Sequence, residues 1–209
     1  VVLVPDLEAA RAAFIDADFT ATPIARHSEA MGTANACIML DGSYIELMGM
    51  VSDTQANEGW RALLSTGPGL KGIALASDDI EATAAMLAEK RIETDPPRHF
   101  SRAMAEGELR FSVIRLPRDM TPGLQCVYCQ HHTRELLWTA DAMHHENGAQ
   151  RIVAASVPGI DALQDLASHP GLPVSEAAEG SVAISMREPI SSPHLEAIQV
   201  TSGLTIEPR

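Results

Sequence analysis

The chain has 209 residues, of which 45% are hydrophobic, so it can bury a sizeable core and has the length of one or two domains. Its 28 acidic residues outnumber 15 lysines and arginines, and the formal net charge of -13 makes nucleic acid and anionic membranes unfavourable partners. Three cysteines and the absence of an apolar run near the roughly 20 residues of a membrane helix favour a cytoplasmic location.

The N-terminal segment predicts a strand followed by a helix. An apolar run, VVLV, stops at Pro5-Asp6, and an alanine-rich stretch with helical spacing follows, so Asp6 is the expected N-cap. Three strand-like stretches come next, FTATPIARH, TANACIMLDG and SYIELMGMV, and Asp41-Gly42 predicts a tight hairpin between the last two. Residues 1–55 therefore form one predicted βαβββ module.

The opening of this module recurs twice along the chain. A shift of 73 residues aligns Asp6 with Asp79, and a shift of 153 residues aligns Pro5 with Pro158. Strand-like stretches follow each time: ETDPPRHFSR, GELRFSVIRL and GLQCVYCQH, then LPVSEAAEG, SVAISMREP and HLEAIQV. We therefore predict a second βαβββ module over 70–133 and a third, shorter βαβββ-like module over 149–201.

The three modules are expected to start their first strands near Val1, Gly72 and Ile152. The connectors at 52–69 and 133–148 predict short helices and loops, and His144-His145-Glu146 is expected to be a solvated loop or a lid. Because one repeat is too small to bury its own sheet face, the predicted fold class is α+β, with the modules fused into larger curved sheets.

The segment CVYCQHH at 126–132 has the spacing of a metal site or a redox pair. On a strand, side chains alternate between the two faces, so Cys126 and Cys129 would point in opposite directions and could share neither a zinc ion nor a disulfide. Cys37 alone does not complete a zinc site. We therefore predict that the cysteines are structural and unbridged.

Three local stretches carry a family resemblance. They are RHSEAMGTAN, with His27, Gly32-Thr33 and Asn35, then Tyr44-Ile45-Glu46-Leu47, then Gly67-Pro68-Gly69-Leu70. Together with the βαβββ repeats, they resemble the glyoxalase-like domain family of the vicinal oxygen chelate superfamily, closely over about 130 residues and loosely over the last 60.

The resemblance implies two modules that form a cup around a small-molecule site. It also implies metal ligands from a histidine on the first strand and a glutamate on the last strand of a module. Glu46 matches the glutamate, whereas the histidine would lie before Val1 and its counterpart in the second repeat is Gly72. Aligning Tyr44-Ile45-Glu46-Leu47 with Tyr128-Cys129-Gln130-His131 places residues 126–132 on the last strand of the second module.

The expected site follows from this alignment. Glu46 is the expected catalytic residue, with Glu46 and His132 as expected metal ligands. The expected ligand-binding residues are His27, Asn35, Tyr44, Tyr128 and Gln130. A carboxylate in the apolar strand that follows Tyr44 needs a cation, a donor or a wet cavity, so Glu46 could instead pair with His27 or an arginine and bind no ligand. Arg102, Arg110 and Arg115 are either surface charges or a clamp for a substrate carboxylate.

These residues support two readings of the function. The first is a metal-dependent enzyme of isomerase, lyase or dioxygenase type that acts on a small oxygen-rich molecule, with a divalent metal whose identity the ligands do not fix. The alternative is a metal-free binding or resistance protein that uses the same cup, a reading that Gly72 and the neutral Gln130 favour. A structural module that binds a protein partner is disfavoured by the polar groups on the strand faces, and a homodimer is left open.

Overall fold

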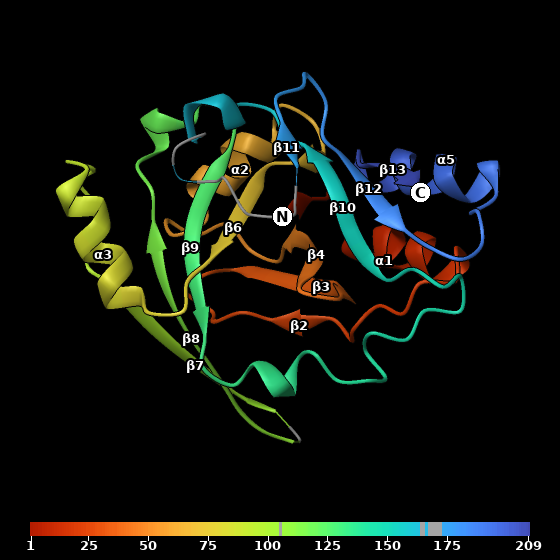
Figure 1. Ribbon diagram of the computed structural model, residues 1–209, viewed down its shortest axis with the longest axis horizontal. Helices are drawn as coiled ribbons and strands as arrows, with labels where there is room; N and C mark the ends of the chain where they lie inside the picture. The colour runs from red at the N-terminus through yellow and green to blue at the C-terminus, as the bar shows by residue number, and fades with distance from the viewer. Residues whose placement is uncertain (105, 164–165, 167–172) are drawn as a thin grey trace.

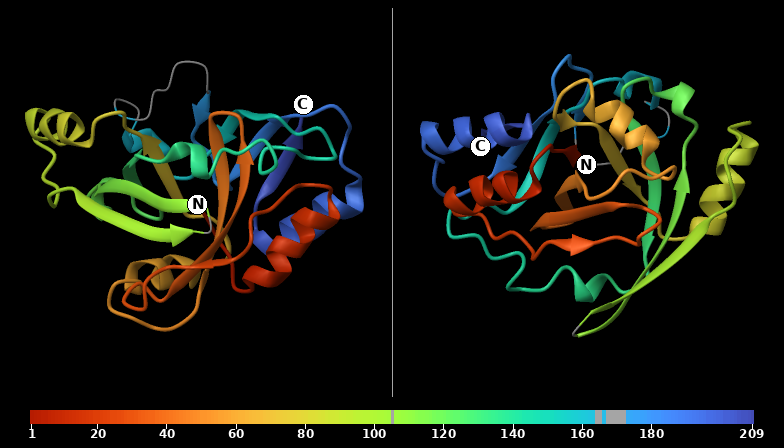
Figure 2. Two further views of the ribbon diagram at one scale, coloured as in Figure 1. Left: turned by 90° about the horizontal axis from the view of Figure 1, so that it is seen from below. Right: turned by 180° about the vertical axis from the view of Figure 1, so that it is seen from behind.

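This computed structural model describes residues 1–104, 106–163, 166 and 173–209. They fold into three mixed sheets and the helices that pack against them (Figure 1). Helices α1 and α5 lie side by side at one end of the molecule, and α3 lies at the other (Figures 1 and 2). The α+β class expected from the sequence is confirmed. No helix among these residues is long and apolar enough to span a bilayer.

The first sheet has the strand order β2-β3-β4-β1-β5. Its strands and the helices between them are β1 (Val2–Leu3), α1 (Leu7–Asp16), β2 (Ala25–Arg26), β3 (Thr33–Leu40), β4 (Ser43–Met50), α2 (Glu58–Leu64) and β5 (Gly69–Leu70). The Asp6 carboxylate accepts a hydrogen bond of 2.9 Å from the Ala9 amide, which confirms the predicted N-cap. Gly42, with φ of 72°, makes the tight turn between β3 and β4.

The second sheet repeats this arrangement with the order β6-β9-β8-β7. Its elements are β6 (Gly72–Ala76), α3 (Ile80–Glu89), β7 (Arg98–Met104), β8 (Gly107–Arg115), η1 (Arg118–Met120), β9 (Gln125–His131) and η2 (Arg134–Leu136). Asp79 caps α3 by accepting from the amides of Glu81 and Ala82, as Asp6 caps α1. The expected strand start near Gly72 is confirmed.

The third sheet departs from the predicted pattern, with the order β11-β10-β12-β13. Its elements are β10 (Arg151–Ser156), η3 (Ile160–Leu163), β11 (Val174–Ser175), β12 (Ser181–Ser185), α5 (Ser192–Ser202) and β13 (Thr205–Pro208). The expected strand HLEAIQV is wrong, because residues 194–200 lie inside α5. Pro193 stands in the first turn of α5, and Gly203 ends it in the left-handed conformation, with φ of 67°. These are helix signals that alternation alone does not reveal.

The loop between the second and third sheets is fixed by a buried histidine. His145 is only 4% exposed, its Nδ1 accepts from the Thr20 amide at 2.9 Å, and its Nε2 lies 2.8 Å from the Met39 carbonyl. The expectation that this histidine pair is solvated is therefore wrong for His145, although the neighbouring His144 side chain is 70% exposed. The imidazole of His145 links the loop to the main chain of the first sheet.

Two large apolar cores fill the space between the sheets and the helices that cover them. The first core joins α1 and the first sheet to the third sheet and α5, with Phe14, Leu47, Ile184 and Ile198 among its fully buried members. The second core packs α3 and η3 against the second sheet. Because these faces are filled, the opposite faces of the first and second sheets are the ones left to build a site.

Candidate functional site

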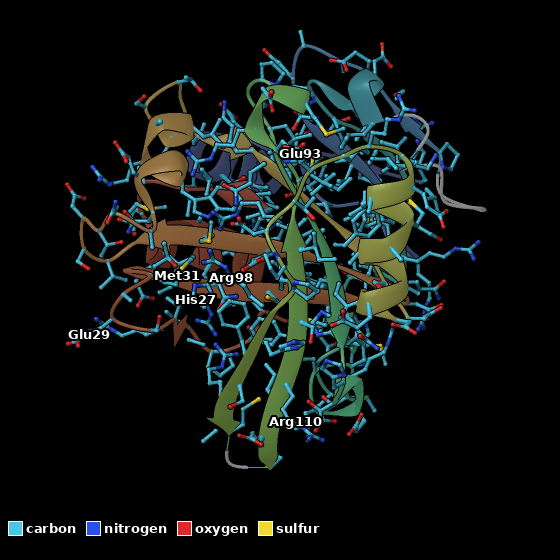
Figure 3. All side chains as sticks on the ribbon, turned by 90° about the vertical axis from the view of Figure 1, so that its left-hand side faces the viewer. His27, Glu29, Met31, Glu93, Arg98 and Arg110 are labelled. Atoms are coloured by element: carbon cyan, nitrogen blue, oxygen red, sulfur yellow. The ribbon has the colours of Figure 1, made fainter. Side chains whose placement is uncertain are left out.

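Aromatic side chains connect the inner faces of the first and second sheets. The centroid of the Tyr44 ring on β4 lies 6.1 Å from that of His131 on β9 and 5.6 Å from that of Trp138. Trp138 follows η2, and its Nε1 donates a 3.0 Å hydrogen bond to the Leu40 carbonyl at the end of β3. Figure 3 is seen from the side of α3 and labels His27, which follows β2, and Arg98 of β7.

Glu46 is the carboxylate that the first sheet contributes to this inner face. Its strand neighbours Ile45 and Leu47 lie in the first core, so strand alternation turns Tyr44 and Glu46 the other way. Glu46 is half-buried, and its Oε1 accepts a 2.7 Å hydrogen bond from Asn35 Nδ2 on β3. The structure therefore brings together three of the predicted residues on one sheet face.

His27 joins this group from the segment just after β2. Its Nδ1 lies 2.7 Å from the Thr33 hydroxyl, and its amide donates to the Thr33 carbonyl. Burial lowers the pKa of His27, the charge of Glu46 opposes that shift, and the charge of Arg102 on β7 adds to it. His27 is thus close enough to both sheets to respond to a carboxylate from one and a guanidinium from the other.

The negative charge of Glu46 acts on several neighbouring side chains. Burial, and then the charge of Glu46, raise the pKa of the Tyr44 hydroxyl well above its usual range. The same two causes raise the pKa of Cys37 and bring that of Cys129 to about 12. Both thiols are therefore protonated near neutral pH, which makes them poor nucleophiles and poor metal ligands.

His131 carries a buried polar atom that lacks a partner. Its Nδ1 is buried and has no hydrogen-bond partner among the described residues, while its ring lies 5.2 Å from Trp138 and 6.3 Å from Phe111. Burial, and then the charge of Arg134, lower the pKa of His131, and the charge of Glu46 opposes them. Arg134 itself stacks over Trp138, with its guanidinium carbon 4.1 Å from the ring centroid. His131, Cys129 and Trp138 were not assigned to the site from the sequence, whereas Arg102 is one of the three arginines named there as a possible carboxylate clamp.

Two predicted ligand-binding residues lie on the other face of the second sheet. Tyr128 is 6% exposed within the second core, and its hydroxyl donates to the Leu166 carbonyl at 3.2 Å. Gln130 accepts from the Ile80 amide at the start of α3 and donates to the Asp78 carbonyl. The expectation that these two side chains share a face with Glu46 is wrong, because Tyr128 lies in the core that contains α3 and Gln130 bonds to the start of α3.

Strand register explains this error. Leu47 pairs with Val2 in the first sheet, and Tyr128 pairs with Leu75 in the second; Val2 and Leu75 stand at the same distance before the two N-cap aspartates. Tyr128 therefore corresponds to Leu47 and not to Tyr44. Leu47 and Tyr44 are three positions apart. Because side chains on a strand alternate between its two faces, a shift in the alignment by an odd number of residues assigns every side chain to the wrong face.

His132 lies on the same outer face as Gln130. Its Nε2 is 2.7 Å from the Ser112 hydroxyl, and Ser112 pairs with Gln130 across β8 and β9. The expected metal pair of Glu46 and His132 is therefore wrong, since Glu46 of the first sheet lies toward the inner face of the second sheet and His132 lies on its outer face.

The remaining donors do not fit a divalent metal bound by protein ligands. No three histidine, cysteine, aspartate or glutamate side chains converge in the part of the chain that the structure describes. At Gly72, where the resemblance implies a second histidine, an added Cβ would lie 2.8 Å from Trp60 Cη2 and 3.1 Å from the Gln125 carbonyl oxygen. Trp60 thus fills the space that a metal-binding side chain at this position would need.

The cysteines of CVYCQHH match the expectation from strand alternation. Cys37, Cys126 and Cys129 are free of disulfides. Cys126 is buried in the second core, where burial raises its thiol pKa to about 11, whereas Cys129 responds to the charge of Glu46 on the other face. The prediction of unbridged cysteines on opposite faces is confirmed.

Comparisons with known proteins agree with this architecture. Residues 1–168 match the family described as Glyoxalase-like domain. A hypothetical protein from Staphylococcus aureus aligns over 100% of this chain and 98% of its own, with a TM-score of 0.68 and 13% identity.

More distant structural similarity extends to two epimerases. Methylmalonyl-CoA epimerase from Streptomyces coelicolor covers 63% of this chain and 94% of its own, at 20% identity and a TM-score of 0.47. The corresponding enzyme from Mycobacterium tuberculosis covers 65% and 87%, at 19% identity and 0.48. A comparison with curated protein sequences finds no match. Since the family match spans most of the chain, the protein belongs to the glyoxalase-like domain family.

Proposed function

We propose that the protein binds a small, oxygen-rich organic anion between the inner faces of its first two sheets. The observation that carries this proposal is His131 Nδ1, a buried polar atom on the face that Glu46 influences, for which the described residues supply no hydrogen-bond partner. Leaving such an atom unsatisfied costs about 1–3 kcal/mol, so a ligand hydroxyl or carboxylate that bonds to it would recover part of that free energy.

The walls of this region define the chemistry of the ligand. The first sheet supplies a carboxylate, Glu46, that accepts hydrogen bonds, and the second supplies the guanidinium of Arg102, whose charge acts on both His27 and Cys37. Tyr44 and Trp138 add aromatic surface. A small molecule with an acidic group for Arg102 and a hydroxyl or an acidic C–H for Glu46 is complementary to these side chains.

One observation favours catalysis in addition to binding. Asn35 holds Glu46 Oε1, whereas Oε2 makes no hydrogen bond with any described residue. A carboxylate held by one oxygen and open at the other is suited to remove a proton from carbon next to a carbonyl. Since the donors around Glu46 do not form a metal site, we propose a metal-independent proton abstraction, with Arg102 and His131 as the groups that would orient the substrate.

Ligand binding can be read from Trp138. The chain has two tryptophans, so Trp60→Phe leaves Trp138 as the sole reporter beside His131 and Tyr44. We expect pyruvate and glyoxylate to change its fluorescence in a saturable way, and Arg102→Gln to weaken both. The exposed Arg151, on the third sheet, provides the matched control Arg151→Gln. No saturable change with either oxo acid, or an equal loss in both arginine variants, would contradict the proposal.

Catalysis has a separate readout. If Glu46 removes carbon-bound protons, the protein will accelerate exchange of the pyruvate methyl protons with deuterium from the solvent, as followed by proton NMR. Glu46→Gln should abolish the acceleration. Exchange that persists in this variant would assign the proton acceptor to another group.

A further inference from the structure

A cavity lies on the outer face of the second sheet, away from the candidate site. It has a volume of about 560 Å³ and is lined by residues of β7 and β8 and by His132, which follows β9. Strand alternation turns five of these side chains to one face: His99, Ser101, Arg110, Ser112 and His132. This is the face that carries Gln130, so the cavity is separate from the region around Glu46.

The lining has the opposite chemistry from the protein as a whole. The chain carries a formal charge of -13, yet none of the described side chains that line the cavity is acidic. Arg110 is exposed, and its guanidinium forms no ion pair with a described residue. Figure 3 shows Arg110 on the β7–β8 hairpin, which extends away from the rest of the molecule. A guanidinium next to two imidazoles and two hydroxyls is a set of groups that favours an oxyanion.

Ser112 couples the two histidines at this site. Its side chain is fully buried, and its hydroxyl oxygen lies 2.7 Å from His99 Nδ1 and 2.7 Å from His132 Nε2. A hydroxyl has one proton, so Ser112 can donate to one ring and must accept from the other when both bonds form between neutral rings. His99 Nε2 and His132 Nδ1 are the nitrogens that this arrangement leaves for a ligand.

The hydrogen bonds to Ser112 determine whether each of these two outer nitrogens donates a hydrogen bond to a ligand or accepts one from it. The ring that accepts from Ser112 carries its own proton on the outer nitrogen, and the ring that donates to Ser112 has a lone pair there. Two neutral imidazoles thus offer one donor and one acceptor, beside the positive charge of Arg110. The complementary ligand is an oxyanion that also carries a hydroxyl.

We propose that this cavity binds a hydroxyl-bearing oxyanion, through Arg110, His99 and His132, with Ser112 as the residue that positions the two imidazoles. Phosphate in its protonated forms and 2-hydroxycarboxylates share this chemistry. Sulfate and acetate lack the hydroxyl near neutral pH, so they serve as matched probes for the two ligand classes.

Amide NMR titrations at pH 7 and constant ionic strength test the proposal. We expect phosphate to shift the resonances of β7 and β8 saturably and to bind about fivefold more tightly than sulfate, the effect of one hydrogen bond. If the natural ligand is a hydroxy acid, lactate should bind more tightly than acetate by a similar factor. If the natural ligand is a phosphate compound, only phosphate should give saturable chemical-shift changes. Absence of saturable shifts with both phosphate and lactate would overturn the proposal.

Variants identify the groups that bind. Arg110→Gln should weaken phosphate binding about tenfold, the effect of losing a charged hydrogen bond, while Arg151→Gln leaves it unchanged. Ser112→Ala should bring the affinities for phosphate and sulfate together, because each imidazole is then free to take either tautomer. If Ser112→Ala does not fold, His99→Gln should show the same loss of discrimination. Equal affinity of wild-type protein for phosphate and sulfate would contradict the role of the coupled imidazoles.

This site can also be distinguished from the one between the sheets. Glu46→Gln should leave phosphate binding unchanged, since Glu46 belongs to the first sheet and lies toward the opposite face of the second sheet. Loss of phosphate binding in that variant would show that the anion enters the inner region and would overturn the assignment to the outer face.

Discussion

Asn35 donates a 2.7 Å hydrogen bond to Glu46 diagonally across the hairpin of β3 and β4. The residue directly opposite Glu46 is Cys37, whose protonated thiol leaves the amide of Asn35 as the stronger donor. This bond fixes one carboxylate oxygen on the inner face and leaves the other without a described partner. The half-buried carboxylate therefore has a structural anchor and a free oxygen at once.

Replacement of Glu46 by glutamine separates these two roles. The amide has the same shape and can still accept from Asn35, so we expect the free energy of unfolding in urea to change by less than about 1 kcal/mol. Binding of pyruvate, followed by Trp138 fluorescence in the Trp60→Phe background, should be lost. Unchanged binding together with unchanged stability would show that Glu46 is neither a site residue nor a buried partner.

The two tyrosines give a direct test of which strand faces build the site. Tyr128→Phe removes a buried hydroxyl that bonds to the Leu166 carbonyl, so it should lower the free energy of unfolding by about 1 kcal/mol and leave pyruvate binding intact. Tyr44→Phe should instead weaken pyruvate binding with a smaller effect on stability. The opposite pattern in fluorescence titrations and urea unfolding would show that Tyr128 lies on the inner face.

The burial of His145 leads us to expect that the free energy of unfolding decreases in acid. Burial lowers the pKa of His145 below its usual value near 6.5, although its contact with the Met39 carbonyl opposes this. As the pH falls through 6.5, the unfolded chain takes up a proton that the folded protein does not, so stability decreases by up to about 1.4 kcal/mol per pH unit until the folded pKa is reached.

Urea unfolding at pH 7.5 and 5.5 measures this effect. We expect His145→Gln to be less stable than wild type at pH 7.5 and to lose less stability between the two pH values. His144→Gln, at the exposed neighbouring position, should keep the wild-type difference. An equal pH difference in wild type and His145→Gln would assign the acid sensitivity to other groups.

Gly72 is expected to tolerate no side chain because Trp60 occupies the space. Gly72→Ala places a Cβ 2.8 Å from Trp60 Cη2 and should lower the free energy of unfolding by roughly 1–3 kcal/mol. Trp60→Phe removes the clashing atom, so the cost of Gly72→Ala should be smaller in that background by more than about 0.5 kcal/mol. Additive effects in the double-mutant cycle would mean that the main chain at Gln125, and not Trp60, limits this position.

The parts of the fold that the sequence predicts are the ones with local signals. Asp6 and Asp79 each stand between an apolar run and an alanine-rich stretch, and both cap helices as expected. Pro193 and Gly203 are equally local signals, because proline is common in the first turn of a helix and glycine just after its end. The apolar pattern of residues 194–200 is also compatible with a strand, so pattern alone predicts the wrong element there.

The candidate site was only half predictable for a different reason. His27, Asn35, Tyr44 and Glu46 lie within one hairpin and its neighbouring strand, so their shared face follows from local alternation. The second wall depends on the pairing of β9 with β6, which is set by residues about 50 positions apart. Nothing local to residues 126–132 shows which of the two adjacent histidines turns inward. The effect of the Arg102 charge on His27 and the hydrogen bond of Trp138 to Leu40 both depend on tertiary structure that no short motif records.

Because α1 packs against α5, the C-terminal helix shares one apolar core with the N-terminal sheet. Phe14 and Leu47 share one buried core with Ile184 and Ile198, although the family match stops at residue 168. A shortened protein that stops there would expose the apolar side of the sheet that holds Glu46. The C-terminal residues 173–209 thus act as an intramolecular partner, and the first sheet and α5 should unfold together as one cooperative unit.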